Sequence, residues 1–115
     1  MPFIFRRKMQ PETKFKMKVQ KELKAMNSVW IVKTQAVALR GIPDILGCIN
    51  GFFFALELKS KNMRPTKLQE YNLNLIAMAY GLAVVAYPEN WELVKQKIKE
   101  LGEGTLNMIP PGKMR

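Results

Sequence analysis

The sequence predicts one α/β domain in which a mixed four-stranded sheet is flanked by helices. Apolar residues recur at helical spacing in some segments, and short runs rich in β-branched and aromatic residues lie between them. Asn50-Gly51 separates two apolar runs, which is the strongest short-range signal for an antiparallel hairpin. The 115 residues fit a single domain that is long enough to bury a hydrophobic core.

The first half of the chain is expected to form an arm, a helix and three strands. Residues 1–10 are a basic arm, and Pro11 suits the first turn of the helix that follows. Residues 29–34 are predicted to form a strand, and residues 44–49 and 52–59 the two strands of the hairpin. The apolar face of the helix is formed by Phe15, Val19, Leu23 and Met26.

The second half is expected to add a crossover helix, a fourth strand and a last helix. Thr66 opens a helix with capping-box spacing that runs to about residue 80, and Gly81 suits its C-cap. Residues 82–87 form a buried strand, residues 88–102 a helix and residues 103–115 a tail. The apolar face of the crossover helix is formed by Leu68, Tyr71, Leu75 and Met78.

The composition indicates an intracellular protein with a polyanionic partner. The chain has 19 Lys and Arg against 9 Asp and Glu, a net charge of +10, and nucleic acid is the commonest polyanion. A lysine-rich surface that serves only solubility is the alternative. The single cysteine, Cys48, cannot form an intramolecular disulfide, which favours a reducing compartment. We expect no secretory signal, because the start lacks a long apolar core, and no membrane segment.

The absence of histidine excludes several kinds of enzyme. A Ser-His-Asp triad, Cys-His catalysis and a histidine general base all need this residue. Histidine-rich zinc sites are excluded as well, and one cysteine cannot form a thiolate zinc site. The chain also lacks the glycine-rich motifs that cradle nucleotide phosphates. An enzyme of this composition must work with carboxylates, lysines and arginines, either alone or together with a hard metal ion.

Three charged residues interrupt the apolar hairpin, and they fall on one face. If Asn50-Gly51 is a two-residue turn, counting outward places Asp44 directly opposite Glu57. Lys59 lies two residues further along and shares that face. A bulge in either strand would shift this pairing by one residue.

Two opposed carboxylates repel each other and therefore need compensation. One of them is protonated, or Lys59 neutralises them, or a cation lies between them. Of these three possibilities, a bound Mg²⁺ would be the most useful for catalysis, because this ion binds one or two carboxylates together with phosphate oxygens. A bound ion would polarise a phosphate and acidify an attacking water.

Helical periodicity places a further acid, Glu12, in the same direction as Val19 and Leu23, toward the core. The alternative is a solvated first-turn residue that interacts favourably with the helix dipole. Trp30 and Trp91 are expected in the core rather than as platforms for base stacking.

Several segments together resemble one nuclease family. The strings "PETKFKMKVQKELK", "VWIVKTQ", "GIPDILGCINGFFFALELK" and "TKLQEYNLNLIAMAYG" are similar to stand-alone virus-type replication-repair nucleases (VRR-NUC) of the PD-(D/E)XK superfamily. The resemblance covers residues 11–87 and implies a restriction-endonuclease-like αβββαβ core, to which residues 88–102 add a C-terminal helix.

The resemblance also implies a site, a cofactor and partners. It assigns metal binding to Asp44, Glu57, the Leu58 carbonyl and Glu12, catalysis to Lys59, and a supporting contact to Gln69, for which the capping box is a sufficient alternative. Such proteins hydrolyse phosphodiesters with Mg²⁺ or Mn²⁺ in replication, recombination or repair, and we expect a bacterial or phage-infected cell. Small members commonly form homodimers and act on branched DNA such as Holliday junctions. A catalytically silent nucleic-acid-binding module, or a subunit that needs a helicase or recombinase partner, is the alternative.

Overall fold

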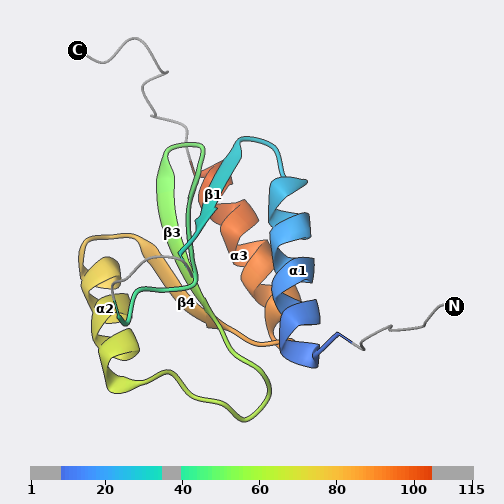
Figure 1. Ribbon diagram of the computed structural model, residues 1–115. Helices are drawn as coiled ribbons and strands as arrows, with labels where there is room; N and C mark the ends of the chain where they lie inside the picture. The colour runs from blue at the N-terminus through green and yellow to red at the C-terminus, as the bar shows by residue number, and fades with distance from the viewer. Residues whose placement is uncertain (1–8, 35–39, 105–115) are drawn as a thin grey trace, which may run out of the picture.

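A four-stranded mixed sheet lies between α1 and α3 on one face and α2 on the other (Figure 1). The structure is a computed structural model, which describes residues 9–34 and 40–104. The elements, in chain order, are α1 (Pro11–Lys24), β1 (Val29–Lys33), β2 (Ile45–Ile49), β3 (Phe52–Leu58), α2 (Lys67–Met78), β4 (Leu82–Ala86) and α3 (Trp91–Glu103).

The sheet has the strand order β1-β2-β3-β4. The first three strands form an antiparallel meander, and β4 pairs with β3 in parallel after the α2 crossover. This topology confirms the predicted order of elements, including the C-terminal helix after the core. The arm 1–10 and the tail 103–115 fall almost entirely outside the described residues.

The β2–β3 hairpin has the register that the sequence predicted. Asn50 and Gly51 have φ values of 48° and 90°, the positive values that a type I′ turn requires. Pairing runs without a bulge from Ile49 opposite Phe52 to Ile45 opposite Leu56. The next position outward therefore brings Asp44 to the same level as Glu57.

The main core lies between the sheet and the α1–α3 layer. It contains apolar side chains of the hairpin, three residues of the predicted apolar face of α1, and Trp91, as predicted. These residues are Ile45, Ile49, Phe54, Leu56 and Leu58 of the hairpin and Phe15, Val19 and Leu23 of α1. Gly47 permits this packing, because a Cβ there would come within 2.4 Å of Cζ of the buried Phe54 ring. The hairpin therefore combines a tight turn with a close ring-to-backbone contact.

Two helix boundaries differ from the prediction. The last helix begins at Trp91 rather than at residue 88, because Asn90 first closes a turn in which its Oδ1 accepts the Tyr87 N–H at 2.7 Å. At the end of α2 the left-handed residue is Tyr80, with φ of 70°, rather than Gly81. Gly81 is needed for space instead, since its Cβ would lie 2.8 Å from Ile76 Cγ2.

The predicted apolar face of α2 is exposed, and Leu73 is the one buried residue of that helix. Trp30 contradicts its predicted core position, because 66% of it is exposed. The reason is that α2 packs against β3 and β4, whereas Trp30 lies on β1 at the opposite edge of the sheet. Among the described helices, none is both long and apolar enough to cross a membrane.

Replacing Gly47 by Ala is expected to lower the free energy of unfolding by about 1–3 kcal/mol, because the new methyl group must displace the Phe54 ring. Urea unfolding of both proteins measures this difference. Gly104→Ala is the matched control, since its nearest contact would be an ordinary 3.5 Å to the Leu101 carbonyl. An unchanged free energy of unfolding for Gly47→Ala would contradict the proposed packing.

Candidate active site

A pocket of about 230 Å³ collects every site position that the sequence and the family resemblance indicated. It opens where β2 begins and β3 ends, and the first turns of α1 and α2 complete its wall. The predicted residues that line it are Glu12, Asp44, Glu57, Leu58, Lys59 and Gln69. Residues that are far apart in the sequence therefore meet in one concave surface.

Asp44 is fixed from two sides. Its Oδ2 accepts the Leu58 N–H at 2.8 Å, and its backbone carbonyl accepts the Thr34 N–H at 3.0 Å. The Thr34 hydroxyl also donates to the carbonyl of Pro43, the preceding residue. These bonds fix the Asp44 carboxylate beside β3, so little reorganisation is needed to bind a ligand.

Glu57 is a buried acid that is not fully compensated. Only 2% of it is exposed, its Oε2 lies 3.2 Å from Lys59 Nζ, and its Oε1 has no hydrogen-bond partner among the described residues. Burial, reinforced by the Asp44 carboxylate, raises the pKa of Glu57 to about 7, and the Lys59 ammonium opposes this shift. Lys59 therefore neutralises the acid only in part.

The available oxygen atoms suit a hard divalent ion. Carboxylates and backbone carbonyls are ligands that suit Mg²⁺, and Glu57 lies beside Asp44 in a polar pocket. The described residues do not, however, form a group of three or more acidic, histidine or cysteine side chains placed to hold a metal. The acid pair is thus the centre of the candidate site.

Glu12 and Gln69 line the pocket but already have structural partners. Glu12 is 60% exposed in its side chain and lies 3.6 Å from Lys16, which favours the solvated first-turn interpretation. Gln69 forms the predicted capping box with Thr66. Its side-chain Oε1 accepts the Thr66 backbone N–H at 2.8 Å, and its backbone N–H donates to Thr66 Oγ1. Each residue therefore has a structural role that needs no ligand. Any role in the site would replace these contacts or add to them.

Sequence reasoning missed three residues that also line the pocket: Lys16, Ser60 and Met63. Lys16 could have been found, because it lies one helical turn after Glu12 and therefore faces the same side. Ser60 directly follows Lys59, so the strand end carries it to the pocket. Met63 arrives through the loop after β3, whose course the sequence did not predict.

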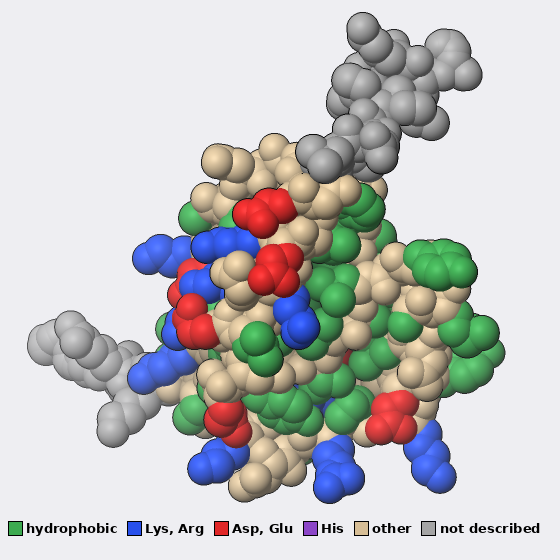
Figure 2. All heavy atoms as spheres, turned by 180° about the vertical axis from the view of Figure 1, so that it is seen from behind, with side chains coloured by type: hydrophobic (Ala, Val, Ile, Leu, Met, Phe, Trp, Pro, Cys, Tyr) green, Lys and Arg blue, Asp and Glu red, His purple; other side chains and the backbone are tan. Residues whose placement is uncertain are grey.

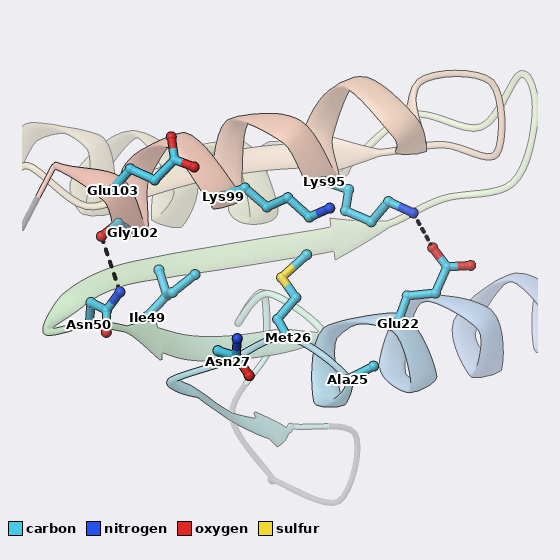
Figure 3. A pocket seen from close by; sticks show the side chains of 10 residues that line it. All are labelled: Glu22, Ala25, Met26, Asn27, Ile49, Asn50, Lys95, Lys99, Gly102 and Glu103. Atoms are coloured by element: carbon cyan, nitrogen blue, oxygen red, sulfur yellow. Dashed lines mark hydrogen bonds and ion pairs between the residues drawn. The ribbon is translucent and has the colours of Figure 1, made fainter.

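A larger pocket of about 570 Å³ lies elsewhere, between the C-terminal parts of α1 and α3 (Figure 3). At one end of it Glu22 accepts hydrogen bonds from Lys95 Nζ at 2.7 Å and from Trp91 Nε1 at 2.8 Å. These bonds lower the pKa of Glu22 and raise that of Lys95. Since the charges of Glu22 and Lys95 compensate each other, we interpret this ion pair as a structural contact that holds α1 against α3.

The pH dependence of stability is expected to report the burial of Glu57. Between its ordinary pKa of 4.5 and about 7, the folded protein retains a proton that the unfolded chain releases. The resulting stabilisation, up to about 3 kcal/mol, is complete below the lower value and lost as pH rises through the upper one.

Urea unfolding in EDTA at about pH 5 and about pH 8 measures this effect in the native chain and in Glu57→Gln. The difference between the two proteins isolates Glu57, because every other ionisable group is common to both. A pH dependence that is identical in the two proteins would mean that Glu57 is not desolvated.

Comparison of the chain with known protein families, with curated proteins and with solved structures found no match. The resemblance to the VRR-NUC nucleases therefore depends on the motifs in the sequence. What the site can do must be argued from its own geometry.

Proposed function

We propose that the chain is a Mg²⁺- or Mn²⁺-dependent endodeoxyribonuclease that hydrolyses phosphodiester bonds, with branched DNA such as a Holliday junction as its substrate. The observation that carries this proposal is the buried Glu57, one oxygen of which has no partner within residues 9–34 and 40–104, next to Asp44 and Lys59 in an open pocket. A buried carboxylate in this state costs stability, and such costs are concentrated at functional sites.

Asp44 and Glu57, with the Leu58 carbonyl, are the residues that would hold the divalent ion. Bound there, the ion would polarise a phosphoryl oxygen and lower the pKa of the attacking water. The chain contributes a fixed position for both acids: Asp44 through its bond to the Leu58 N–H, and Glu57 through its place within β3. Preorganisation of this kind avoids the cost of ordering the ligands during the reaction.

Lys59 is the second chemical group of the proposed site. Its backbone N–H donates to the Ala86 carbonyl at 3.0 Å, and its ammonium group is held near Glu57, so the side chain is anchored at both ends. From this position it can orient the attacking water or stabilise negative charge that develops on the phosphoryl oxygens. Attack of water on phosphorus with departure of the 3′ oxygen would leave a 5′-phosphate and a 3′-hydroxyl.

Nucleic acid suits the charge of the chain. The net charge is +10, and the loop after β3 exposes Lys61 and Arg64 close to the pocket residue Met63. Contacts of lysine and arginine with phosphates release counterions, so binding should weaken steeply as salt is raised. The preference for branched DNA comes from the family resemblance.

A silent nucleic-acid-binding module of the same fold is the second candidate. It is favoured by one observation, that Glu12 is solvated and does not join Asp44 and Glu57 in a three-acid cluster. This candidate keeps DNA binding and predicts no hydrolysis of any substrate.

The nuclease proposal predicts cleavage of labelled DNA in Mg²⁺ or Mn²⁺ and none in EDTA. A panel of four-way junctions, flaps, single strands and linear duplex serves as substrate. Asp44→Asn, Glu57→Gln and Lys59→Met are each expected to lower the cleavage rate by at least about a hundredfold, because each removes a ligand or a stabilising charge.

Lys97→Met is the matched control, since Lys97 is an exposed lysine of α3 outside the pocket. It should cleave at nearly the native rate. Cleavage that persists in EDTA or in the three pocket variants would refute the metal-site mechanism, whereas binding without cleavage on every substrate would favour the silent module.

Gln69 and Thr66 allow the capping role to be separated from a role in the site. Gln69→Ala and Thr66→Ala each break the capping box and should lower the free energy of unfolding by about 1 kcal/mol. Only Gln69 lines the pocket, so Gln69→Ala is expected to lose more cleavage activity than Thr66→Ala. Equal activities in the two variants would leave Gln69 as a helix cap alone.

A further inference from the structure

A second polar pocket, of about 330 Å³, lies beside the candidate active site. Its lining consists of Asn62, Met63, Arg64, Tyr87 and Glu89. Met63 lines this pocket and the candidate active site alike, so the two pockets are neighbours. A long ligand that is bound at the acid pair can therefore extend into the second pocket.

Tyr87 gives this pocket an aromatic wall that is held in place. Its hydroxyl donates to the Met63 carbonyl at 2.8 Å, and its backbone N–H donates to Asn90 Oδ1 at 2.7 Å. Tyr87 directly follows Ala86, whose carbonyl accepts the Lys59 N–H, so the ring lies at the end of β4 close to the acid pair. A ring that is already fixed can stack on a flat ligand with little further loss of conformational freedom.

The loop between β3 and α2 forms the other side of the pocket. The Met63 N–H donates to the Ser60 carbonyl at 3.1 Å, which closes a turn, and Asn62 within this turn has a left-handed φ of 68°. Arg64 follows the turn and is exposed. Lys and Arg side chains line the lower edge of the molecule in Figure 2, the edge where this loop lies in Figure 1. A polyanion at this edge meets a guanidinium group that can bind one of its phosphates through two hydrogen bonds.

The side chains of the pocket combine the groups that recognise a nucleotide. An aromatic ring stacks on a base, a guanidinium group binds a phosphate, and a carboxylate accepts hydrogen bonds from the amino group of a base. Tyr87, Arg64 and Glu89 supply these three groups. The carboxylate of Glu89 also repels phosphate, which favours the base rather than the backbone on its side of the pocket.

We propose that this pocket binds one unpaired nucleotide of the DNA strand that is held at the acid pair, with the base against Tyr87 and its phosphate at Arg64. A base inside a duplex is stacked on both faces, so only an unpaired or extruded base can lie against the ring. Branched and bulged DNA offer such nucleotides. The inference deepens the proposed function and rests on it for DNA as the ligand. It gives this chain a means of distinguishing branched DNA from linear duplex.

Binding of bulged DNA in EDTA and at fixed salt tests the proposal without requiring cleavage. The probes are labelled duplexes that differ at one central position, which carries an unpaired cytosine, an unpaired thymine or an abasic nucleotide. The native chain is expected to bind the cytosine bulge at least about fivefold more tightly than the abasic bulge, because the base can stack on an aromatic side chain. Cytosine should also bind at least about twofold more tightly than thymine, since only cytosine has an amino group that can donate to Glu89.

Four substitutions separate the contacts of the pocket. Tyr87→Leu should remove the advantage of a base over the abasic position, whereas Tyr87→Phe keeps the ring and should retain most of it. Arg64→Met should weaken the binding of all three probes by a similar factor, because each probe has the phosphate. Glu89→Ala should remove the preference for cytosine over thymine. Circular dichroism confirms that each variant is folded.

Tyr71→Leu is the matched control, because Tyr71 is an exposed tyrosine of α2 that lies outside the pocket. This variant should bind the three probes as the native chain does. Equal affinity of the native chain for the cytosine and abasic bulges would overturn the proposal. A preference that survives Tyr87→Leu, or that Tyr71→Leu removes, would also overturn it, and equal affinity for cytosine and thymine would overturn the contact assigned to Glu89. A native chain that prefers the unpaired base but cleaves no DNA in Mg²⁺ would support this pocket and refute the nuclease proposal instead.

Discussion

The burial of Glu57 beside Asp44 is the constraint on which the rest of the site depends. The two carboxylates face each other across the hairpin and repel. Because Glu57 is buried in the apolar strand β3, little water is available to stabilise its charge. The Lys59 ammonium compensates one Glu57 oxygen, and the other has no hydrogen-bond partner among the residues that the structure describes. A sequence selected for stability alone would not retain this arrangement, which is why we associate it with chemistry.

The scaffold around this pair is held by local contacts. The type I′ turn sets the register, the Phe54 ring packs against the Gly47 backbone, and the Leu58 N–H holds Asp44 at the strand end. Two helices bring their first turns to the same pocket, which adds Glu12 and Gln69 at its rim. The type I′ turn, the packing of the Phe54 ring and the positions of the two acids therefore all belong to one hairpin. A change in any of them would affect the others.

The sequence predicted the hairpin and its pairing because the two-residue turn fixes the register and strand periodicity then fixes each face. It did not predict the exposure of Trp30 or of the apolar face of α2. Apolar periodicity shows that a helix has an apolar face, but not whether the same chain supplies the layer that covers it. Tyr80 took the left-handed position expected of Gly81, because α2 ends at Met78 with Ala79 as its C-cap, and Tyr80 is the next residue. Met63 was missed because local patterns in the sequence do not give the course of the loop after β3.

A carbon-13 NMR titration of the Glu57 carboxyl group, with and without Mg²⁺, tests the central claim most directly. Without the ion, the pKa of Glu57 is predicted to be about 7; with saturating Mg²⁺, the group should stay ionised to a clearly lower pH, because the ion stabilises its charged form. Glu22, which lies outside the pocket, should titrate identically in both conditions. A Glu57 that titrates at the same pH with and without Mg²⁺ would contradict the account of this acid pair as a metal site.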